Sequence, residues 1–425
     1  MTDLTEYLKA AKSPYHAVEF TAKRLEEAGF KKLELTEKFE LKKGGAYYLS
    51  PYPRALFAFR ISENVTGKGI HIACAHTDSP TFRIKPSADM DERGGARRIN
   101  VEPYGGMLKK TWFDRALGVA GVVYVSGENA YEPKAVLFDS KDAWFIIPSL
   151  APHMDREIEE KKLDAQKELI PLFGLAGDKK LSLTEALADK IGVKESEILD
   201  YDLELYICDD PIFCGPDRDF LLAARIDNIA SVAALTEGLI AAGKSEDSND
   251  ISLIALFDNE EIGSRTKQGA DSNIVNMIID RIFESDLYSG ISKVSVISLG
   301  RILSVDGAHG VHPNYPEKAD ETARVFLGKG VVLKSSASQR YVTDPEMGAI
   351  LSRICSDNGI MLQRQANRSG APGGQTLGPI ISAYLPIPAA DIGIPMLAMH
   401  SAKETMCLSD YEMLLKLSEK FLSVV

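Results

Sequence analysis

The sequence predicts an α/β protein in which a second domain is inserted into the first. Short apolar runs such as 251–257 are bounded by polar residues, which is typical of strands buried on both faces of a sheet. Segments with apolar residues at helical spacing alternate with these runs, at 4–29, where Pro14 divides the pattern into two helices, and at 229–240. Because 425 residues is long for one hydrophobic core, two domains are expected.

The domain boundaries follow from a change in the type of segment along the chain. The segment 91–216 begins with a glycine-containing loop and includes a charged, helix-prone stretch at 155–180. Candidate ligands occur on both sides of this segment. We therefore expect residues 1–90 and 217–425 to form the domain that carries the site, with 91–216 as the inserted domain.

Composition and charge exclude several classes of function. The chain is 45% hydrophobic and 26% charged, which is ordinary for a globular protein, and its net charge of -12 argues against a nucleic-acid partner. No apolar run reaches the ~20 residues that span a bilayer, and no signal peptide is recognised, so a cytoplasmic protein without a membrane partner is expected. The five scattered cysteines predict reduced thiols.

Two adjacent carboxylates, Glu260 and Glu261, follow the apolar run 251–257. Side chains just beyond the carboxyl end of such a strand face the crevice where open α/β sheets bind ligands. Neighbouring acids repel each other and resist desolvation unless a cation or a shared proton relieves them. They are therefore candidates for a metal ligand and a general base, with a solvated charged loop as the alternative.

Two further ligand-type residues lie near the ends of apolar runs. His76 follows the run 70–75, and the carboxylate of Asp78 could orient the ring of a metal-bound imidazole, although a capped turn explains the pair as well. Asp227 precedes the helical segment 229–240. It could bridge two cations or serve only as the helix N-cap.

The same pattern recurs twice in the last third of the chain. Asp306 follows the apolar run 294–299, which we expect to be a strand, and is itself followed by His309 and His312. His400 stands at the end of another apolar run. One such coincidence means little, but several at the same edge of a sheet indicate a site.

Imidazole and carboxylate groups from five separate segments indicate a two-metal centre. Nitrogen and oxygen ligands without thiolates suit zinc, cobalt or manganese, and zinc is the commonest choice. Two metals would lower the pKa of a bridging water to near ~7, and one acid must stay off the metals to accept the proton of that water.

These segments resemble the motifs of the aspartyl aminopeptidase and aminopeptidase I family of dizinc exopeptidases. The matching motifs occur in order over nearly the whole chain, as His76-Thr77-Asp78-Ser79-Pro80, Tyr104-Gly105-Gly106, Trp112-Phe113-Asp114-Arg115, Pro148-Ser149-Leu150-Ala151-Pro152-His153, Arg225-Ile226-Asp227-Asn228, Asp258-Asn259-Glu260-Glu261-Ile262-Gly263-Ser264, Asp306 to Asn314, Gln339-Arg340-Tyr341 and Ala398-Met399-His400-Ser401. The resemblance implies a mixed-sheet dizinc exopeptidase catalytic domain with an inserted, mainly β dimerisation domain.

The resemblance also implies a role for each site residue. Asp227 would bridge two zinc ions per subunit, with cobalt or manganese as alternatives, and the full set of implied metal ligands is His76, Asp227, Glu261, Asp306 and His400. Glu260 would be the catalytic base. Asp78 would orient the first histidine ligand or support the metal.

Assembly and specificity are further implications of the resemblance. The inserted domain would form dimers that build a dodecamer, in which His153 reaches a neighbouring active site, although a capping role explains this histidine as well. Lys334 would lie near the pocket for the first substrate side chain and favour an acidic residue, with a solvated lysine as the alternative. Gly370 and Gln375 depart from the residues of many relatives, so the preferred substrate residue is not inherited from the family name.

The sequence thus predicts a metallo-aminopeptidase that removes the N-terminal residue, acidic in one hypothesis, from short peptides. A two-metal-bound hydroxide would attack the peptide bond, and Glu260 would take its proton. A related dizinc carboxypeptidase or deacylase is one alternative. An idle assembly or cargo-binding relative is another.

Overall fold

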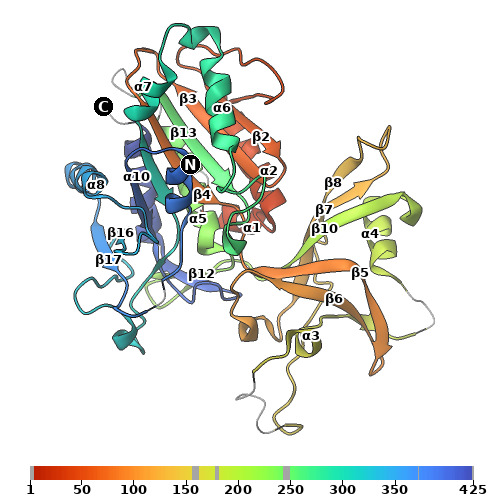
Figure 1. Ribbon diagram of the computed structural model, residues 1–425. Helices are drawn as coiled ribbons and strands as arrows, with labels where there is room; N and C mark the ends of the chain where they lie inside the picture. The colour runs from red at the N-terminus through yellow and green to blue at the C-terminus, as the bar shows by residue number, and fades with distance from the viewer. Residues whose placement is uncertain (1–3, 156–161, 178–180, 243–248, 372, 424–425) are drawn as a thin grey trace. The chain divides into compact units, whose positions relative to one another are not determined.

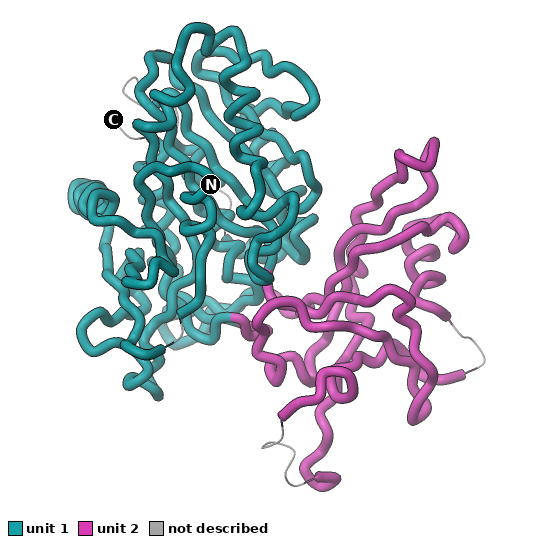
Figure 2. The backbone as a smooth tube through the Cα atoms, in the orientation of Figure 1, with its two compact units in different colours: residues 1–78, 211–399, 404–425 teal, residues 79–210, 400–403 magenta. Residues whose placement is uncertain are grey.

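The chain divides into two compact units, and each is described by itself (Figure 2). The computed structural model describes residues 4–155, 162–177, 181–242, 249–371 and 373–423. The first unit comprises residues 1–78, 211–399 and 404–425, and the second comprises 79–210 and 400–403. The chain therefore leaves the first unit directly after Asp78 and returns to it at Pro211.

A mixed sheet forms the centre of the first unit (Figure 1). Within the described residues it has nine strands, in the spatial order β1 (Lys31–Lys32), β2 (Ala46–Tyr52), β3 (Ala55–Ile61), β13 (Ile251–Phe257), β4 (Ile70–His76), β14 (Arg301–Val305), β18 (Ala389–Gly393), β16 (Val331–Ser335) and β17 (Leu362–Ala366). β4 pairs in parallel with both β13 and β14, whereas β3 runs antiparallel to β13 and β16 antiparallel to β18. The predicted α/β class with a mixed sheet is confirmed.

Alternate residues of the central strands face two separate hydrophobic cores, as the period of two in a strand requires. In β3, Leu56 belongs to one core and Phe57 to the other, and in β13 the same holds for Leu256 and Phe257. The first core is completed by α1 (Leu4–Ala10), α2 (Pro14–Glu27), α5 (Ile226–Ala241), α8 (Pro345–Asp357) and α10 (Leu408–Leu422). The second is completed by α6 (Ile274–Phe283), α7 (Lys293–Ser298) and α9 (Leu377–Tyr384). Helices thus cover both faces of the sheet.

The strand expected at 294–299 is wrong, because Lys293–Ser298 form helix α7. The hydroxyl of Ser292 accepts the N–H of Ser295 at 3.3 Å and caps this helix. Of its β-branched residues, Val296 is buried while Val294 is exposed, which is the pattern of one helical turn against the core. Alternating valine and serine resembled a strand because β-branched residues are enriched there. The strand that leads into Asp306 is β14.

Little of the described part of the helix-prone stretch at 155–180 is helical. Among its described residues, α3 covers only Ala165–Glu168, and β9 (Leu172–Leu175) follows as a strand. Residues 156–161 and 178–180 lie outside the described residues. Here pairing of β9 with β6 (Ala96–Tyr104) prevails over the local preference of the charged residues for helix.

The second unit is built mainly on an antiparallel sheet. Its six strands within the described residues are, in spatial order, β8 (Lys134–Asp139), β7 (Leu117–Val125), β10 (Ile198–Ile207), β5 (Thr81–Arg93), β6 (Ala96–Tyr104) and β9. The helix α4 (Leu183–Ile191) begins at a capping box formed by Ser182 and Glu185 and ends at Gly192 in the left-handed region.

A smaller sheet in the first unit includes the strands that follow β14 and β18 in the chain. In spatial order its strands are β11 (Ile212–Cys214), β12 (Phe220–Ala223), β20 (Glu404–Cys407), β19 (Pro395–Leu397) and β15 (Ala308–His309). Short 3₁₀ helices include η3 (Glu260–Ile262) and η5 (Pro316–Lys318). No helix in the described part of the chain has both the length and the apolar character needed to cross a bilayer.

Gly393, the last residue of β18, allows the chain to pass close to Asp306. A Cβ atom at this position would lie 1.9 Å from the carbonyl oxygen of Asp306 and 3.1 Å from Cε of Lys334. The backbone oxygen cannot move freely, because the N–H of Asp306 donates to Ile392 at 3.0 Å. A glycine is therefore needed beside the segment that carries Asp306.

We predict that Gly393→Ala destabilises the protein by about 1–3 kcal/mol or more, because the added methyl group overpacks a backbone contact. Thermal unfolding measures the effect. Gly348→Ala is the matched control, since its Cβ would meet its nearest neighbour, Leu333, at an ordinary 3.6 Å and lies within helix α8. The control should keep or raise the melting temperature. A melting temperature for Gly393→Ala equal to that of the unaltered protein would contradict the close approach.

Candidate active site

Three neighbouring strands deliver polar residues to one edge of the mixed sheet. In the parallel pair of β4 and β13, His76 lies opposite Phe257, so η3 begins just beyond the same edge. β14 lies on the other side of β4 and ends one residue before Asp306. The carboxyl ends of parallel strands meet at one edge, as the sequence pattern predicts.

The buried imidazole of His76 faces several carboxylates. Its Nε2 lies 3.5 Å from Oδ1 of Asp227, 3.5 Å from Oδ1 of Asp306 and 4.0 Å from Oε2 of Glu260. The His76 side chain is only 1% exposed. Residues from β4, from the start of α5, from η3 and from the end of β14 therefore meet around one nitrogen atom.

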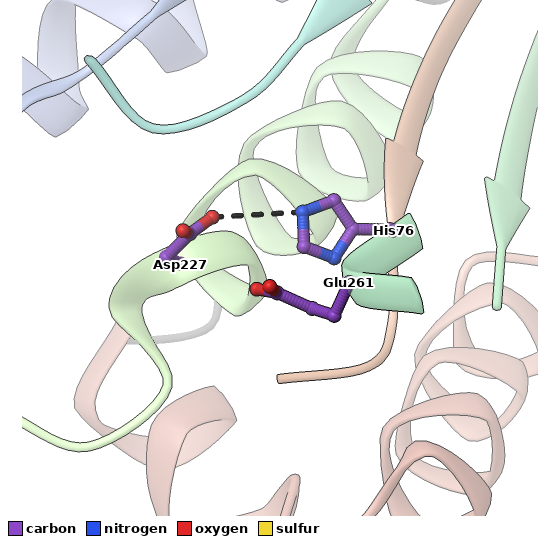
Figure 3. Close-up of side chains that lie close together, drawn as sticks. All are labelled: His76, Asp227 and Glu261. Atoms are coloured by element: carbon purple, nitrogen blue, oxygen red, sulfur yellow. Dashed lines mark ion pairs between the residues drawn. The ribbon is translucent and has the colours of Figure 1, made fainter. Parts of the chain in front are cut away.

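Glu261 joins the same cluster from η3. One ligand atom each of His76, Asp227 and Glu261 lie within 4.8 Å of one another. Figure 3 shows these three side chains converging from β4, α5 and η3. Side chains from distant parts of the sequence thus form a group that could hold a metal ion.

Asp78 fixes the geometry of this cluster from behind. Nδ1 of His76 donates to the backbone oxygen of Asp78 at 3.0 Å and lies 3.4 Å from its Oδ1. The two carboxylate oxygens of Asp78 accept the backbone N–H groups of Glu260, at 3.1 Å, and Glu261, at 3.2 Å. These bonds assign a proton to Nδ1 and leave Nε2 of His76 as the ring nitrogen that faces the carboxylates.

The carboxylate of Asp227 faces His76, so this residue does more than begin a helix. It lies at a kink near the start of α5, where Asp227 and Asn228 both have non-helical backbone angles and Arg225 precedes them at φ 60°. The backbone N–H of Asp227 donates to the buried carboxylate of Glu404 at 2.9 Å. Sequence reasoning missed Glu404, because no periodicity or motif linked it to Asp227, 177 residues away.

A second buried contact supports η3. Nε of Arg54 donates to Oδ2 of Asp258 at 2.6 Å, and Nη2 of the same guanidinium donates to Oδ1 of Asp258 at 3.2 Å. This bidentate pair holds the residue that directly precedes the turn at Asn259, where φ is 62°. Arg54 lies in a turn between two strands and carried no sequence signal of this role.

The electrostatics of the cluster favour a cation. The pKa of Glu260 is raised to about 8, and burial is the largest cause. The neighbouring carboxylates of Asp306, Asp78 and Asp227 raise this pKa further, whereas His76 lowers it. Burial disfavours protonation of His76, yet its hydrogen bonds to the same three acids raise its pKa well above the ordinary value. Acids that stabilise a protonated imidazole would also stabilise a divalent metal in place of the proton.

The donor set fits zinc. Two atoms bound tetrahedrally to one zinc ion at about 2.1 Å lie about 3.4 Å apart. The distances from Nε2 of His76 to Asp227 and Asp306 are both 3.5 Å. One imidazole and several carboxylates, with the second ring nitrogen held by Asp78, are the ligands and the orienting partner that zinc sites use.

The remaining predicted site residues lie in different places. Lys334 is on β16 and only 2% exposed. Its ammonium lies 3.8 Å from Oδ2 of Asp306 and 5.5 Å from the centre of the Tyr341 ring. It also donates a hydrogen bond to the backbone oxygen of Gly307. The alternative of a solvated lysine is therefore wrong. β16 is paired on both sides within a sheet whose two faces are covered by helices, and residues 331–334 are all buried in it.

His400 and His153 belong to the second unit. Nδ1 of His400 lies 3.2 Å from the backbone oxygen of Gly106, and its own backbone oxygen accepts the N–H of Leu108 at 2.9 Å. His153 is exposed in a turn closed by the bond from the N–H of Met154 to the oxygen of Ala151.

A buried imidazole with carboxylates at the carboxyl edge of a mixed sheet is an arrangement that a metal-dependent hydrolase can use. Comparison with known proteins defines the class further. The model of the family "Aminopeptidase I zinc metalloprotease (M18)" matches residues 7–422. The chain belongs to this family, and it is a zinc-dependent metallo-aminopeptidase.

Relatives match over nearly their whole length. The chain is 38% identical to "Probable M18 family aminopeptidase 2" of Clostridium novyi (strain NT), over 99% of this chain and 97% of the relative. Among solved structures, prApe1 superposes with a TM-score of 0.93 at 28% identity, covering 99% of this chain and 93% of that one. The S. cerevesiae mApe1 dodecamer superposes with a TM-score of 0.86 at 26% identity, covering 99% and 95%.

We predict that Asp78→Asn lowers zinc affinity about 10- to 100-fold, because the amide keeps only one acceptor oxygen for the two N–H groups and loses the charge beside His76. Competition with a chelator measures the affinity. Asp410→Asn is the control, since Asp410 also accepts two backbone N–H groups, from Gly328 and Gly330 at 2.7 Å each, but has no imidazole beside it. Equal zinc affinity of Asp78→Asn and the unaltered protein would contradict the orienting role.

Proposed function

We propose that this aminopeptidase hydrolyses the first peptide bond of short peptides at a two-metal site. The observation that supports it most is the approach of two carboxylates to Nε2 of His76 at 3.5 Å in a buried setting. The ligands in this proposal are His76, Asp227, Glu261, Asp306 and His400, with Asp227 as the bridge between two zinc ions. When bound, the metals would polarise the scissile carbonyl and lower the pKa of a water molecule.

Glu260 is the base in this mechanism. Its carboxylate lies farther from Nε2 of His76 than those of Asp227 and Asp306, at 4.0 Å against 3.5 Å, and its backbone is held by Asp78. A carboxylate beside the ligands, but not among them, can take the proton of the attacking water and pass it to the leaving nitrogen. The Glu260 side chain is only 14% exposed, which limits the access of bulk water to this transfer.

We predict that Glu260→Gln retains zinc but lowers kcat about 100- to 10,000-fold, because the amide cannot accept a proton. Glu261→Gln, one residue away, should instead lose zinc, because it removes a ligand. Metal analysis of dialysed protein and turnover of a tripeptide with a free amine measure both effects. Activity of Glu260→Gln close to that of the unaltered enzyme would contradict its assignment as the base.

The same assay separates an aminopeptidase from a related dizinc deacylase or carboxypeptidase. An aminopeptidase needs the free amine, so an N-acetylated copy of the tripeptide should not be cleaved. Cleavage of the blocked peptide at a comparable rate would favour the rival enzyme class.

Lys334 supports a preference for acidic N-terminal residues. Its ammonium is buried beside Asp306, with the Tyr341 ring and the oxygen of Gly307 as its other neighbours. A buried cation within reach of the reaction centre could form a charge-assisted hydrogen bond with a substrate carboxylate.

We predict that Lys334→Met lowers kcat/KM for Asp and Glu aminoacyl substrates about tenfold or more relative to the Leu substrate. Methionine retains most of the side-chain volume but not the charge, so the fold should persist. Initial rates with Asp, Glu, Leu and Lys substrates measure the preference. A preference of the unaltered enzyme for Lys would contradict the hypothesis.

Self-association is a further part of the proposal. The matched mApe1 structure is a dodecamer. We infer that the second unit forms dimers of this chain and that these build a similar assembly, in which the exposed His153 reaches a neighbouring site. The residue ranges of the proposed domains are 1–90 with 217–425 for catalysis and 91–216 for dimerisation.

A further inference from the structure

The segment 400–403 belongs to the second unit and begins with His400, which is a ligand in the proposed two-metal site. His400 has a backbone φ of 67°, in the left-handed region. This conformation is uncommon for a residue with a side chain, and it persists only where surrounding contacts hold it. The contacts that hold His400 therefore bear on the proposed metal site.

Two contacts from the loop that precedes η1 (Lys109–Trp112) fix His400 itself. Its backbone oxygen accepts the N–H of Leu108 at 2.9 Å, and its Nδ1 lies 3.2 Å from the backbone oxygen of Gly106. Because a backbone oxygen can only accept, Nδ1 carries the proton in this bond. An imidazole that donates from one nitrogen binds a metal through the other, so Nε2 is the ligand atom of His400 in the proposed site.

The Thr111 side chain connects this loop to the 400–403 segment a second time. Its hydroxyl donates to the backbone oxygen of Leu108 at 2.6 Å and accepts the N–H of Ala402 at 2.8 Å. Ala402 is only 1% exposed, so water cannot readily replace the hydroxyl as the partner of this N–H. One hydroxyl, which donates and accepts at once, therefore closes the connection between Leu108 and the segment that carries His400.

An ion pair holds the other end of the segment. Nζ of Lys403 lies 2.8 Å from Oδ2 of Asp209, and the Lys403 side chain is 7% exposed. Nη1 of Arg115 lies 3.4 Å from the same oxygen, and Nε of Arg115 donates to the backbone oxygen of Thr111 at 2.8 Å. The segment is thereby fixed at both ends, which restricts the directions that the His400 side chain can take.

These contacts also give a role to two motifs of the sequence. Gly106 ends the motif at 104–106, and Arg115 ends the motif at 112–115. The mechanism proposed above assigns no task to either motif. Here both contribute atoms that orient the segment beginning at His400.

We propose that Thr111 is a positioning residue for one of the two metals, because its hydroxyl holds the 400–403 segment so that Nε2 of His400 is presented to the ion. The inference rests on the proposed function, in which His400 is a ligand. Loss of an orienting partner typically lowers metal affinity about 10- to 100-fold, since the ligand must then be ordered when the metal binds. Only the ion that uses His400 should depend on Thr111.

The test measures the affinities of the two zinc ions by competition with a chelator and counts the ions retained per subunit. His400→Ala identifies the ion that depends on the histidine, because it removes the ligand. Thr111→Val retains the shape of the side chain but lacks the hydroxyl. It should weaken the binding of that same ion about 10- to 100-fold and leave the other ion unchanged.

Two further variants serve as controls. Thr111→Ser keeps the hydroxyl and should retain both ions with the affinities of the unaltered protein. Thr184→Val makes the same substitution elsewhere in the second unit, where the hydroxyl of Thr184 donates to Glu195, and it should also retain both ions.

Three results would overturn the proposal. These are unchanged affinity for both ions in Thr111→Val, equal weakening of both ions, as a general loss of stability would produce, or a defect in Thr111→Ser as large as that in Thr111→Val. Failure of the proposed function gives a different result. In that case His400→Ala would bind zinc as the unaltered protein does, or the unaltered protein would bind fewer than two ions.

Discussion

The gathering of carboxylates around Nε2 of His76 is the constraint on which the rest of the site depends. Buried acids at hydrogen-bonding distance from one imidazole are costly without a compensating cation, because burial disfavours charge and the acids repel one another. The backbone of the folded protein must therefore hold these acids near the imidazole. Parallel pairing of β4 with its two neighbours does this, because it fixes where each chain leaves the sheet.

Hydrogen bonds from residues next to the cluster fix the positions of its side chains more closely than strand pairing alone. Asp78 bonds the ring of His76 and the backbone of η3 at once, so the histidine and the glutamate pair cannot shift independently. Glu404 and Arg54 act in the same way on Asp227 and on the residue that precedes η3. Orienting partners of this kind allow a metal site to select one geometry instead of merely attracting a cation.

The course of the chain after β14 sets the position of Asp306. Asp306 directly follows β14, and its Oδ1 lies 3.5 Å from Nε2 of His76. Gly393 makes this course sterically feasible, since any side chain there would collide with the backbone of Asp306. The close approach of Gly393 thus contributes to the position of a proposed ligand.

The sequence by itself determined the α/β class, the strands that end at His76 and Phe257, and the residue types of a metal centre, because burial on both faces and clustered acids leave a local signature. It failed at 294–299, where β-branched residues form a helix, and it left open whether Lys334 is buried, which depends on the helices that cover the sheet. Only the tertiary structure decided which carboxylates approach His76 and which residues support them. Glu404 and Arg54 act across 177 and 204 positions, and contacts at such separations follow from sheet order, which local propensity does not encode.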